Sequence, residues 1–341
     1  MIERTFFSVG QALFCREKVN GRTIIYDCGG QKEEIVKAAI DRAYPEKDQG
    51  KKEKIDALFI SHYDKDHING VFHLLNRCNV RHLFLPMVSE TSRMLSLYGL
   101  PYSRMLKDFF SNPKMFIRQN YQGTYFHYVV QQSEERLQAI DPIIIDILDG
   151  TEDVYSTTYL RFKDNSDYPD WVYVPYNRKV MTQPEETQFL KKLELPSNAT
   201  LDDILKKWRQ KKLSLKKIIQ ELGIIDIKKI NDYSMTLYSG SIHARNACLF
   251  LGDYNASDYI HELHRAYQPL WQNISVIQVP HHGSWPYYSC GLCQQNTEYV
   301  ISNKYGPYRG RQVNPNQIIE HIKDRLGITC KTTFFGDVVL N

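Results

Sequence analysis

Short apolar runs alternate with amphipathic segments at both ends of the chain. Runs of strand-like composition cover residues 4–8, 22–27, 56–61 and 81–86, and they return at 235–239, 247–251, 274–279 and 298–302. Apolar residues with helical spacing follow Gln31, and a second helix is expected over 69–78. Strands that alternate with helices in this way predict a layered α/β architecture.

The pattern changes between about residues 90 and 228. A helix is expected over 92–110, and the aromatic-rich segment 158–176 has strand-like composition. Pro184 is typical of a helix start, and a capped helix is expected over about 198–222. We interpret this region as an α-rich insertion that interrupts one domain spanning residues 1–341.

The net charge is small but unevenly distributed. The chain has 43 Lys and Arg against 39 Asp and Glu, a formal charge of +4, which alone does not indicate a nucleic-acid-binding protein. Residues 185–230 hold eleven basic and seven acidic residues, so this segment carries the same excess of +4. Its lysines suit either a phosphate-binding surface or a solvated helix face, and the cluster consists of Lys206, Lys207, Lys211, Lys212, Lys216 and Lys217.

Other composition features point away from membranes and disulfides. No stretch approaches 18 consecutive apolar residues, so we expect no membrane-spanning helix. The N-terminus runs directly into a strand-like segment without a signal-peptide pattern, so we expect a cytoplasmic protein. The seven cysteines are then expected to be free thiols, including the isolated pair Cys290 and Cys293.

The segment 61–70 carries the strongest chemical signal in the chain. It places His62, Asp64, Asp66 and His67 within six residues, directly after the apolar run 57–60. Imidazoles and carboxylates both offer lone pairs to a metal at neutral pH. A buried strand that ends in a tight loop directs such side chains into one small volume, where they are costly to desolvate without a partner. The sequence therefore predicts a divalent metal site.

This segment resembles the His-x-His-x-Asp-His motif of the metallo-β-lactamase fold, with Asp64 in place of the second histidine. The form His-x-Asp-x-Asp-His-Ile-x-Gly is similar to the hydrolase domain of ComEC-like DNA-uptake proteins and their stand-alone relatives. Further segments resemble that family in the same order along the chain: 7–11, 23–30, 231–234, 248–253, 279–284 and 301–306. One departure is Asn314-Pro315, where the family usually has His-Pro.

The resemblance implies a four-layer αββα sandwich that binds two divalent ions, Zn²⁺ or Mn²⁺. The positions imply that the first ion is bound by His62 and Asp64, the second by Asp66, His67 and His281, and that Asp253 bridges them. Asp27 would orient the metal loop through hydrogen bonds. The additional carboxylate oxygen of Asp64 favours manganese or magnesium beside zinc.

The first ion lacks one expected ligand. No histidine matches the family's third motif: His243 lies in an expected hairpin turn, the wrong place for it, and nothing requires His127 in the insertion to reach the site. The first ion would then be weakly held, or bound only together with substrate.

The implied chemistry is hydrolysis of a phosphodiester. Two ions about 3.5–4 Å apart activate a water and stabilise both oxygens of an in-line displacement. Asp66, His282 and Ser284 are the expected catalytic residues, and Asn303, Lys304 and Tyr305 are expected phosphate contacts.

DNA or RNA is the expected substrate. The basic cluster would bind the backbone, and the aromatic residues of 159–176 would either stack on unpaired bases or form a core. Two alternatives stay open. One is a hydrolase of nucleotides, lactones or thioesters. The other is an effector of a bacterial antiviral defence system, controlled by a protein partner bound to residues 90–228.

Overall fold

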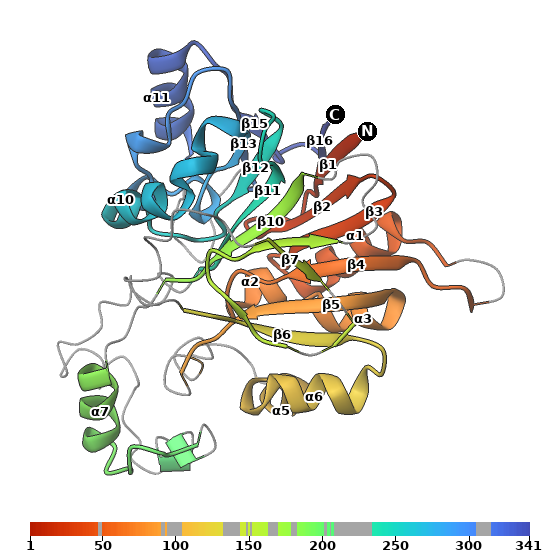
Figure 1. Ribbon diagram of the computed structural model, residues 1–341, viewed down its shortest axis with the longest axis vertical. Helices are drawn as coiled ribbons and strands as arrows, with labels where there is room; N and C mark the ends of the chain where they lie inside the picture. Colours follow the sequence, from red (N-terminus) through yellow and green to blue (C-terminus); the bar gives the residue numbers. More distant parts are fainter. Residues whose placement is uncertain are drawn as a thin grey trace.

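The computed structural model (Figure 1) shows two large β-sheets packed face to face. The structure describes residues 1–46, 50–89, 93, 104–131, 144–147, 149–150, 152–162, 170–178, 183–200, 203–204, 206–207, 234–304 and 315–341. In this part of the chain, no helix is long and apolar enough to cross a membrane.

Sheet A comes mainly from the first half of the chain. In the described part of the chain, its strands lie in the order β16-β1-β2-β3-β4-β5-β6-β8. Neighbours β3 to β8 run parallel, whereas β16, β1, β2 and β3 pair antiparallel. The bounds are β1 Ile2–Phe6, β2 Phe14–Val19, β3 Arg22–Cys28, β4 Lys54–Phe59, β5 Asn79–Pro86, β6 Tyr125–Val130, β8 Val154–Tyr155 and β16 Val338–Leu340.

Sheet B comes mainly from the second half. Its order is β15-β14-β13-β12-β11-β10-β9-β7, and β12 to β15 run parallel. The bounds are β7 Ile144–Ile147, β9 Tyr159–Phe162, β10 Trp171–Tyr176, β11 Thr236–Ser241, β12 Ala247–Phe250, β13 Ile274–Gln278, β14 Glu298–Ile301 and β15 Lys331–Thr332.

Helices cover the outer face of each sheet (Figure 1). Sheet A is covered by α1 (Glu33–Ala43), α3 (Val71–Arg77), α5 (Arg104–Ser111) and α6 (Pro113–Asn120), and sheet B by α10 (Ala256–Tyr267) and α11 (Asn316–Leu326). A third apolar cluster lies between the sheets, where Tyr26 of β3 stacks on Phe250 of β12 at 4.8 Å. Three apolar interfaces therefore separate four layers, and the expected αββα sandwich is confirmed.

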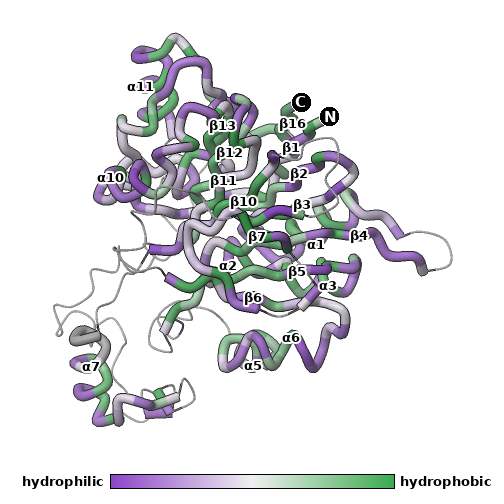
Figure 2. The backbone as a smooth tube through the Cα atoms, in the orientation of Figure 1, coloured by the Kyte–Doolittle hydropathy of each residue, from purple (hydrophilic) through white to green (hydrophobic). Residues whose placement is uncertain are grey.

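The strands are apolar because both of their faces are covered. Residues 55–59 of β4 are all buried, as expected for a parallel strand between two layers. Figure 2 shows hydrophobic residues gathered along the central strands and hydrophilic residues on the outer helices and loops. This is why the apolar runs of the two chain ends predicted β1, β3, β4, β5, β11, β12, β13 and β14 to within two residues at either end.

The described residues between 90 and 228 form both helices and strands. Strands β6 and β8 extend sheet A, and β7, β9 and β10 extend sheet B. The described helices there are α5, α6 and α7 (Gln183–Lys192), the last beginning beside Pro184 as predicted. The α-rich character of the whole insertion stays a prediction, whereas β9 and β10 confirm the strand-like composition of 158–176. The boundaries near 90 and 228 lie outside the described residues.

The parallel strands place loops from both sheets at one edge of the sandwich. The loops after β3 and β4 of sheet A meet those after β12, β13 and β14 of sheet B. His67 contacts both Asp27 and Asp253, and His282 contacts both Asp253 and the Ser302 carbonyl. Ligand sites of α/β proteins form at such carboxyl ends of strands. All the expected metal ligands lie at this edge.

Candidate metal centre

A tight turn after β4 presents the donors of segment 61–70. The short helix α2 (Lys65–Ile68) begins directly after Asp64, whose carbonyl accepts the His67 N–H at 3.0 Å. The backbone of α2 lies against Gly29, where a Cβ atom would stand 1.9 Å from the Asp66 carbonyl oxygen. Only glycine allows this close approach, so the loop after β3 and the metal loop fix each other's position.

Asp27 binds two residues of the metal loop through hydrogen bonds. Its Oδ1 accepts the Ser61 N–H at 2.6 Å, and its Oδ2 accepts the Ser61 hydroxyl at 2.7 Å. The same Oδ2 lies 2.7 Å from His67 Nδ1. Because a carboxylate only accepts, Nδ1 of His67 carries the proton and Nε2 faces the site. This is the contact pattern that the supporting role expected for Asp27 requires.

His62 is held in a similar orientation by two serines. Its Nδ1 lies 2.9 Å from the Ser61 hydroxyl and 3.3 Å from the Ser234 hydroxyl. The Ser234 oxygen also accepts the Asp253 N–H at 2.8 Å. These contacts leave Nε2 of His62 directed toward the other donors. Ser61 and Ser234 were not expected in this role, although both belong to segments that carried the resemblance.

Asp253 lies at the centre, after β12, and its two oxygens face different histidines. Oδ1 lies 3.1 Å from His67 Nε2 and 3.5 Å from His282 Nε2. Oδ2 lies 3.1 Å from His281 Nδ1 and 4.0 Å from His62 Nε2. Both sides of this carboxylate are therefore lined with imidazole nitrogens.

The two consecutive histidines have an uncommon backbone. His281, His282 and Gly283 have φ angles of +49°, +54° and +81°. The left-handed region costs roughly 1–2 kcal/mol for a residue with a Cβ atom. His282 Nδ1 donates to the Ser302 carbonyl at 3.0 Å, and Asn303 Nδ2 donates to the His282 carbonyl at 2.7 Å. Asn303 thus supports this turn, which differs from the phosphate contact expected for it.

The carboxylates of the metal loop complete the cluster. Asp66 Oδ2 lies 3.6 Å from His282 Nε2, and Asp64 Oδ2 lies 3.8 Å from His62 Nε2. Donors that share one ion at about 2.1 Å stand about 3.0–3.5 Å apart. The separations in the cluster are at or slightly above this range, so small shifts would let the donors share ions.

Four buried atoms of the cluster have no hydrogen-bond partner. They are His62 Nε2, His67 Nε2, His282 Nε2 and Asp253 Oδ1. Buried polar atoms without partners are rare in folded proteins because each costs about 1–3 kcal/mol. The unpartnered atoms face one another across a few ångströms, and all are good ligands for a divalent ion. The residues present therefore fit the metal ions that the resemblance implies.

The electrostatics match this interpretation. Burial lowers the pKa of His62 to about 3, so its Nε2 keeps a free lone pair at neutral pH. Burial also opposes protonation of His67, but Asp253 and Asp27 outweigh it and raise the pKa of that imidazole well above 6.5. Burial opposes ionisation of Asp66, yet His282 and His67 hold its pKa at about 2.

Other expected residues lie elsewhere. His127, on β6, hydrogen-bonds to His82 at 3.0 Å and to the Glu152 carbonyl at 2.6 Å, so its ring nitrogens are engaged away from the donors. His243 is exposed in the hairpin after β11. The side chains of segment 159–176 that suggested base stacking are buried, so that interpretation is wrong and the core interpretation is confirmed; they are Tyr159, Phe162, Trp171, Tyr173 and Tyr176.

Only part of the basic cluster can be placed. Lys206 is exposed, and Lys207 lies 3.3 Å from Glu194. Lys304 is exposed just after β14, close in sequence to the supporting Asn303. Tyr305, Lys211, Lys212, Lys216 and Lys217 lie outside the described residues.

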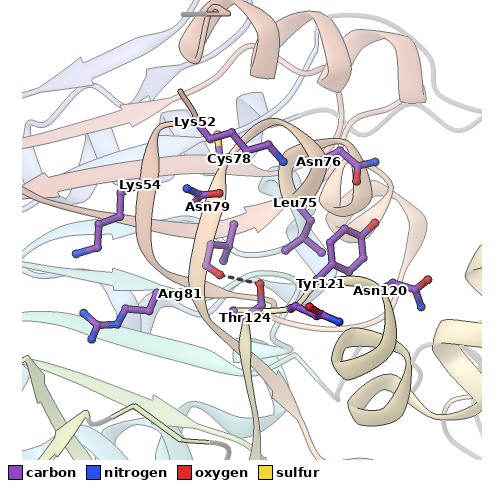
Figure 3. A pocket seen from close by; sticks show the side chains of 13 residues that line it. Lys52, Lys54, Leu75, Asn76, Cys78, Asn79, Arg81, Asn120, Tyr121 and Thr124 are labelled. Atoms are coloured by element: carbon purple, nitrogen blue, oxygen red, sulfur yellow. Dashed lines mark hydrogen bonds between the residues drawn. The ribbon is translucent and has the colours of Figure 1, made fainter. Parts of the chain in front are cut away.

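A hollow of about 610 Å³ lies at the opposite edge of sheet A, where β4, β5 and β6 begin (Figure 3). Its basic residues include Lys52, Lys54 and Arg81. Lys54 pairs with Asp56 at 2.7 Å, and Arg81 makes two 2.7 Å hydrogen bonds to Asp149. Helices α3 and α6 also end here, and their C-termini disfavour anions. The hollow shares no residue with the donor cluster.

Residues 13–109 match the sequence model of the metallo-β-lactamase superfamily. The matched segment includes β2 to β5 and the whole metal loop. No curated protein sequence matches the chain.

Several solved structures align with this chain at low sequence identity. The metallo-β-lactamase fold protein YhfI from Bacillus subtilis aligns at 9% identity over 99% of each chain, with a TM-score of 0.42. Igni18, a metallo hydrolase from the archaeon Ignicoccus hospitalis, aligns at 11% identity over 100% of this chain and 98% of its own, with a TM-score of 0.42. A diphosphatase from the PhnP family aligns at 9% identity over 99% of this chain and 97% of its own, also at 0.42.

Proposed function

We propose that this protein is a metal-dependent hydrolase that cleaves phosphodiester bonds in DNA or RNA. The observation that carries the proposal is the convergence of imidazole and carboxylate donors on Asp253, with four of their buried atoms unpartnered. A cluster of this composition at a strand-end edge suits hydrolytic metal chemistry. The superfamily match over the metal loop supports the same conclusion.

Two ions, Zn²⁺ or Mn²⁺, would be bound on either side of Asp253. Asp66, His67 and His282 would hold one of them, since their ligand atoms lie within 4.8 Å of one another. His62 and Asp64 would hold the other. The sequence assigned His281 to the Asp66 and His67 ion, but the distances favour His282 in that place. Asp64 and Asp66 supply hard oxygens, which favours manganese beside zinc.

Bound divalent ions supply Lewis-acid stabilisation of a phosphoryl group and activate water as a nucleophile. The chain itself contributes orientation. Asp27 and Ser61 fix the tautomers of His67 and His62, and the Ser302 carbonyl fixes that of His282. Each ring therefore presents a lone pair without rearrangement. Asp66, one-quarter exposed at 23%, is accessible to solvent and to a substrate phosphate.

Ser284 and Lys304 are the residues best placed to meet the rest of a phosphodiester. Ser284 follows the His281–Gly283 turn directly, and its N–H donates to the His281 carbonyl at 3.0 Å. Lys304 is exposed and follows the strand whose end supports that turn. A hydroxyl donates to a leaving oxygen, and an ammonium group attracts the phosphate.

A nucleic acid is the proposed substrate because basic residues gather in the segment before β11. Lys206 is exposed and available to a phosphate backbone. Trp285, 43% exposed and three residues after His282, offers an aromatic face near the centre in place of the buried rings of 159–176. Base stacking on such a ring does not depend on sequence.

The test is a substrate panel with purified protein loaded with Mn²⁺ or Zn²⁺. We expect hydrolysis of bis-p-nitrophenyl phosphate and of at least one single- or double-stranded nucleic acid, abolished by a chelator and restored by the ion. Turnover of a nucleotide or a lactone without any cleavage of nucleic acid would instead support the small-substrate alternative. Labelled ends on the nucleic acid distinguish endonuclease from exonuclease products.

A role in antiviral defence under control of a protein partner stays a second hypothesis. The basic segment before β11 would then bind that partner in place of nucleic acid. Charge reversal at Lys206 separates the two: weaker nucleic-acid cleavage with normal hydrolysis of bis-p-nitrophenyl phosphate indicates substrate binding. Unchanged cleavage with loss of a co-purifying protein indicates a partner.

A further inference from the structure

We infer that His281 binds the first ion through Nδ1, and so supplies the ligand that this chain lacks at the family's third histidine motif. The two neighbouring histidines would then serve different ions. This inference rests on the proposed two-ion function and goes beyond it, because neither the motif nor its spacing assigns His281 to that ion.

The two oxygens of Asp253 divide the donors into two sets. Oδ1 faces His67 and His282, at 3.1 and 3.5 Å. Oδ2 faces His281 and His62, at 3.1 and 4.0 Å. His281 and His62 therefore contact the same oxygen of the bridging carboxylate. Each set therefore contains two imidazoles, and the two sets share the carboxylate of Asp253.

The second carboxylate of each set comes from the metal loop. Asp66 lies 3.6 Å from His282, and Asp64 lies 3.8 Å from His62. Each ion would thus have two nitrogen and two oxygen ligands, namely His62, Asp64, His281 and Asp253 for the first and Asp66, His67, His282 and Asp253 for the second. Four protein ligands are what a tightly held zinc requires.

The backbone explains how neighbouring residues reach the same carboxylate. Consecutive side chains in an extended strand point to opposite faces. Left-handed φ values at both His281 and His282 replace that alternation, so both rings contact Asp253. Strain at successive residues with a Cβ atom is typical of functional sites. Tyr287 stacks on the His281 ring with centroids 3.9 Å apart and planes 2° apart, which fixes the ring's orientation.

His281→Asn tests the inference, because asparagine tolerates a left-handed backbone and removes the imidazole. Native mass spectrometry counts zinc ions per chain, and competition with a chelator gives the two affinities. We expect two ions for wild type and one for His281→Asn, with the affinity for the lost ion reduced by more than about 100-fold, since removing an outer contact alone gives roughly 10- to 100-fold. The retained ion shows that the variant is folded.

A second readout counts imidazole ligands directly. In protein loaded with Co²⁺, each bound histidine gives hyperfine-shifted proton resonances. We expect four such histidines in wild type, two in His281→Asn and two in His282→Asn, because each variant loses one ion together with its remaining histidine. His243→Asn, a change at an exposed histidine of the hairpin after β11, serves as the matched control and keeps all four.

Three outcomes would contradict different parts of this assignment. Two ions of unchanged affinity in His281→Asn would overturn the inference and leave the proposed function intact. Equal weakening of both ions would also overturn it, because His281 would then only orient Asp253. A wild-type chain that binds no divalent ion would overturn the proposed function itself, before any variant is compared.

Discussion

At the scale of single residues, the centre depends on contacts that fix which nitrogen of each histidine is free. Asp27 binds His67 directly and reaches His62 through the Ser61 hydroxyl. One buried carboxylate thereby orients two rings. Such outer contacts raise metal affinity because the ligands need no rearrangement when the ion binds.

Ser61→Ala tests the indirect half of this arrangement. The substitution removes the hydroxyl but keeps the backbone N–H that donates to Asp27. We expect roughly 10- to 100-fold weaker binding of the ion held by His62, and a smaller loss for the ion held by His282, because Asp27 still binds His67 directly. Chelator competition monitored for each ion gives the two affinities.

Ser275→Ala is the matched control, since it also removes a single serine hydroxyl, one that lies 3.3 Å from the Ala247 carbonyl on sheet B. Equal losses of affinity in the two variants would contradict the role assigned to Ser61.

The sequence predicted the ligand types better than their pairing. His62, Asp64, Asp66 and His67 are recognisable because four donors stand within six residues. The division of His281 and His282 depends on left-handed backbone angles and on Asp253, which lies far away along the chain. These backbone angles cannot be predicted from the local sequence. His127 was considered as a possible metal ligand because the sequence does not reveal its hydrogen bond to His82.

At the scale of elements, the junction of β3 and α2 sets the position of the metal loop. Gly29→Ala would place a methyl group 1.9 Å from the Asp66 carbonyl oxygen, so α2 must move. We expect destabilisation of about 1–3 kcal/mol from overpacking, together with weaker metal binding. Urea unfolding of the metal-free protein and ion titration measure the two effects.

Gly336→Ala provides the comparison, because nothing lies within 4 Å of its added Cβ atom. A Gly29→Ala protein with the stability and metal affinity of Gly336→Ala would show that the junction is looser than these contacts indicate.

The histidine pair of β5 and β6 makes stability depend on pH. Burial lowers the pKa of His82 to about 4 from 6.5, and burial also lowers the pKa of His127. Both bind protons more readily when unfolded, so the stability they contribute is present above pH 6.5 and is lost as pH falls; for His82 the loss continues toward pH 4. His82 contributes a slope of up to about 1.4 kcal/mol per pH unit between its folded and unfolded pKa values.

His82→Gln removes one titrating group while keeping an N–H donor for His127. We expect its free energy of unfolding in urea to fall less between pH 7 and pH 5 than that of wild type. A pH dependence equal to that of wild type would contradict the lowered pKa of His82.

Element prediction from sequence succeeded where strands are buried on both faces. The runs at 56–61 and 274–279 correspond to β4 and β13, whose burial makes them continuously apolar. β2 was missed because its charged residues Arg16, Glu17 and Lys18 interrupt the pattern. Glu17 is buried all the same, since Arg4 pairs with it at 2.6 Å. An ion pair between two strands, such as that of Arg4 with Glu17, cannot be predicted from the local pattern of apolar and polar residues.

At the scale of the whole molecule, two sheets bring together loops that are about 190 residues apart in sequence. The donors after β4 come from sheet A, and those after β12 and β13 come from sheet B. The two halves of the centre therefore form only when both sheets pack. The middle region strengthens this packing, because β6 to β10 extend the sheets.

If lysine side chains attract the phosphates of a nucleic acid, the affinity for that substrate should depend on salt concentration. If Lys206 and Lys207 contact phosphates, their double charge reversal to glutamate reduces the slope of log affinity against log salt by roughly 0.7–0.9 per contact. Lys206 should contribute more, since Lys207 already pairs with Glu194 at 3.3 Å. Fluorescence anisotropy of labelled nucleic acid with the Asp66→Ala protein measures binding without cleavage.

Lys37→Glu on α1 controls for net charge when it is compared with the single variant Lys206→Glu, because both change the charge by the same amount and Lys37 already pairs with Glu33 at 2.6 Å. An equal change of slope in this control would indicate a general charge effect in place of a contact surface.

The proposed activity requires that the donors around Asp253 bind divalent ions and that these ions perform hydrolysis. Metal content is therefore measured beside turnover of bis-p-nitrophenyl phosphate, for wild type and Asp66→Ala prepared in parallel. We expect the variant to lose the ion held by His67 and His282 and to lose turnover together with it. Normal turnover in Asp66→Ala, or turnover by wild type stripped of all divalent ions, would contradict the proposed function.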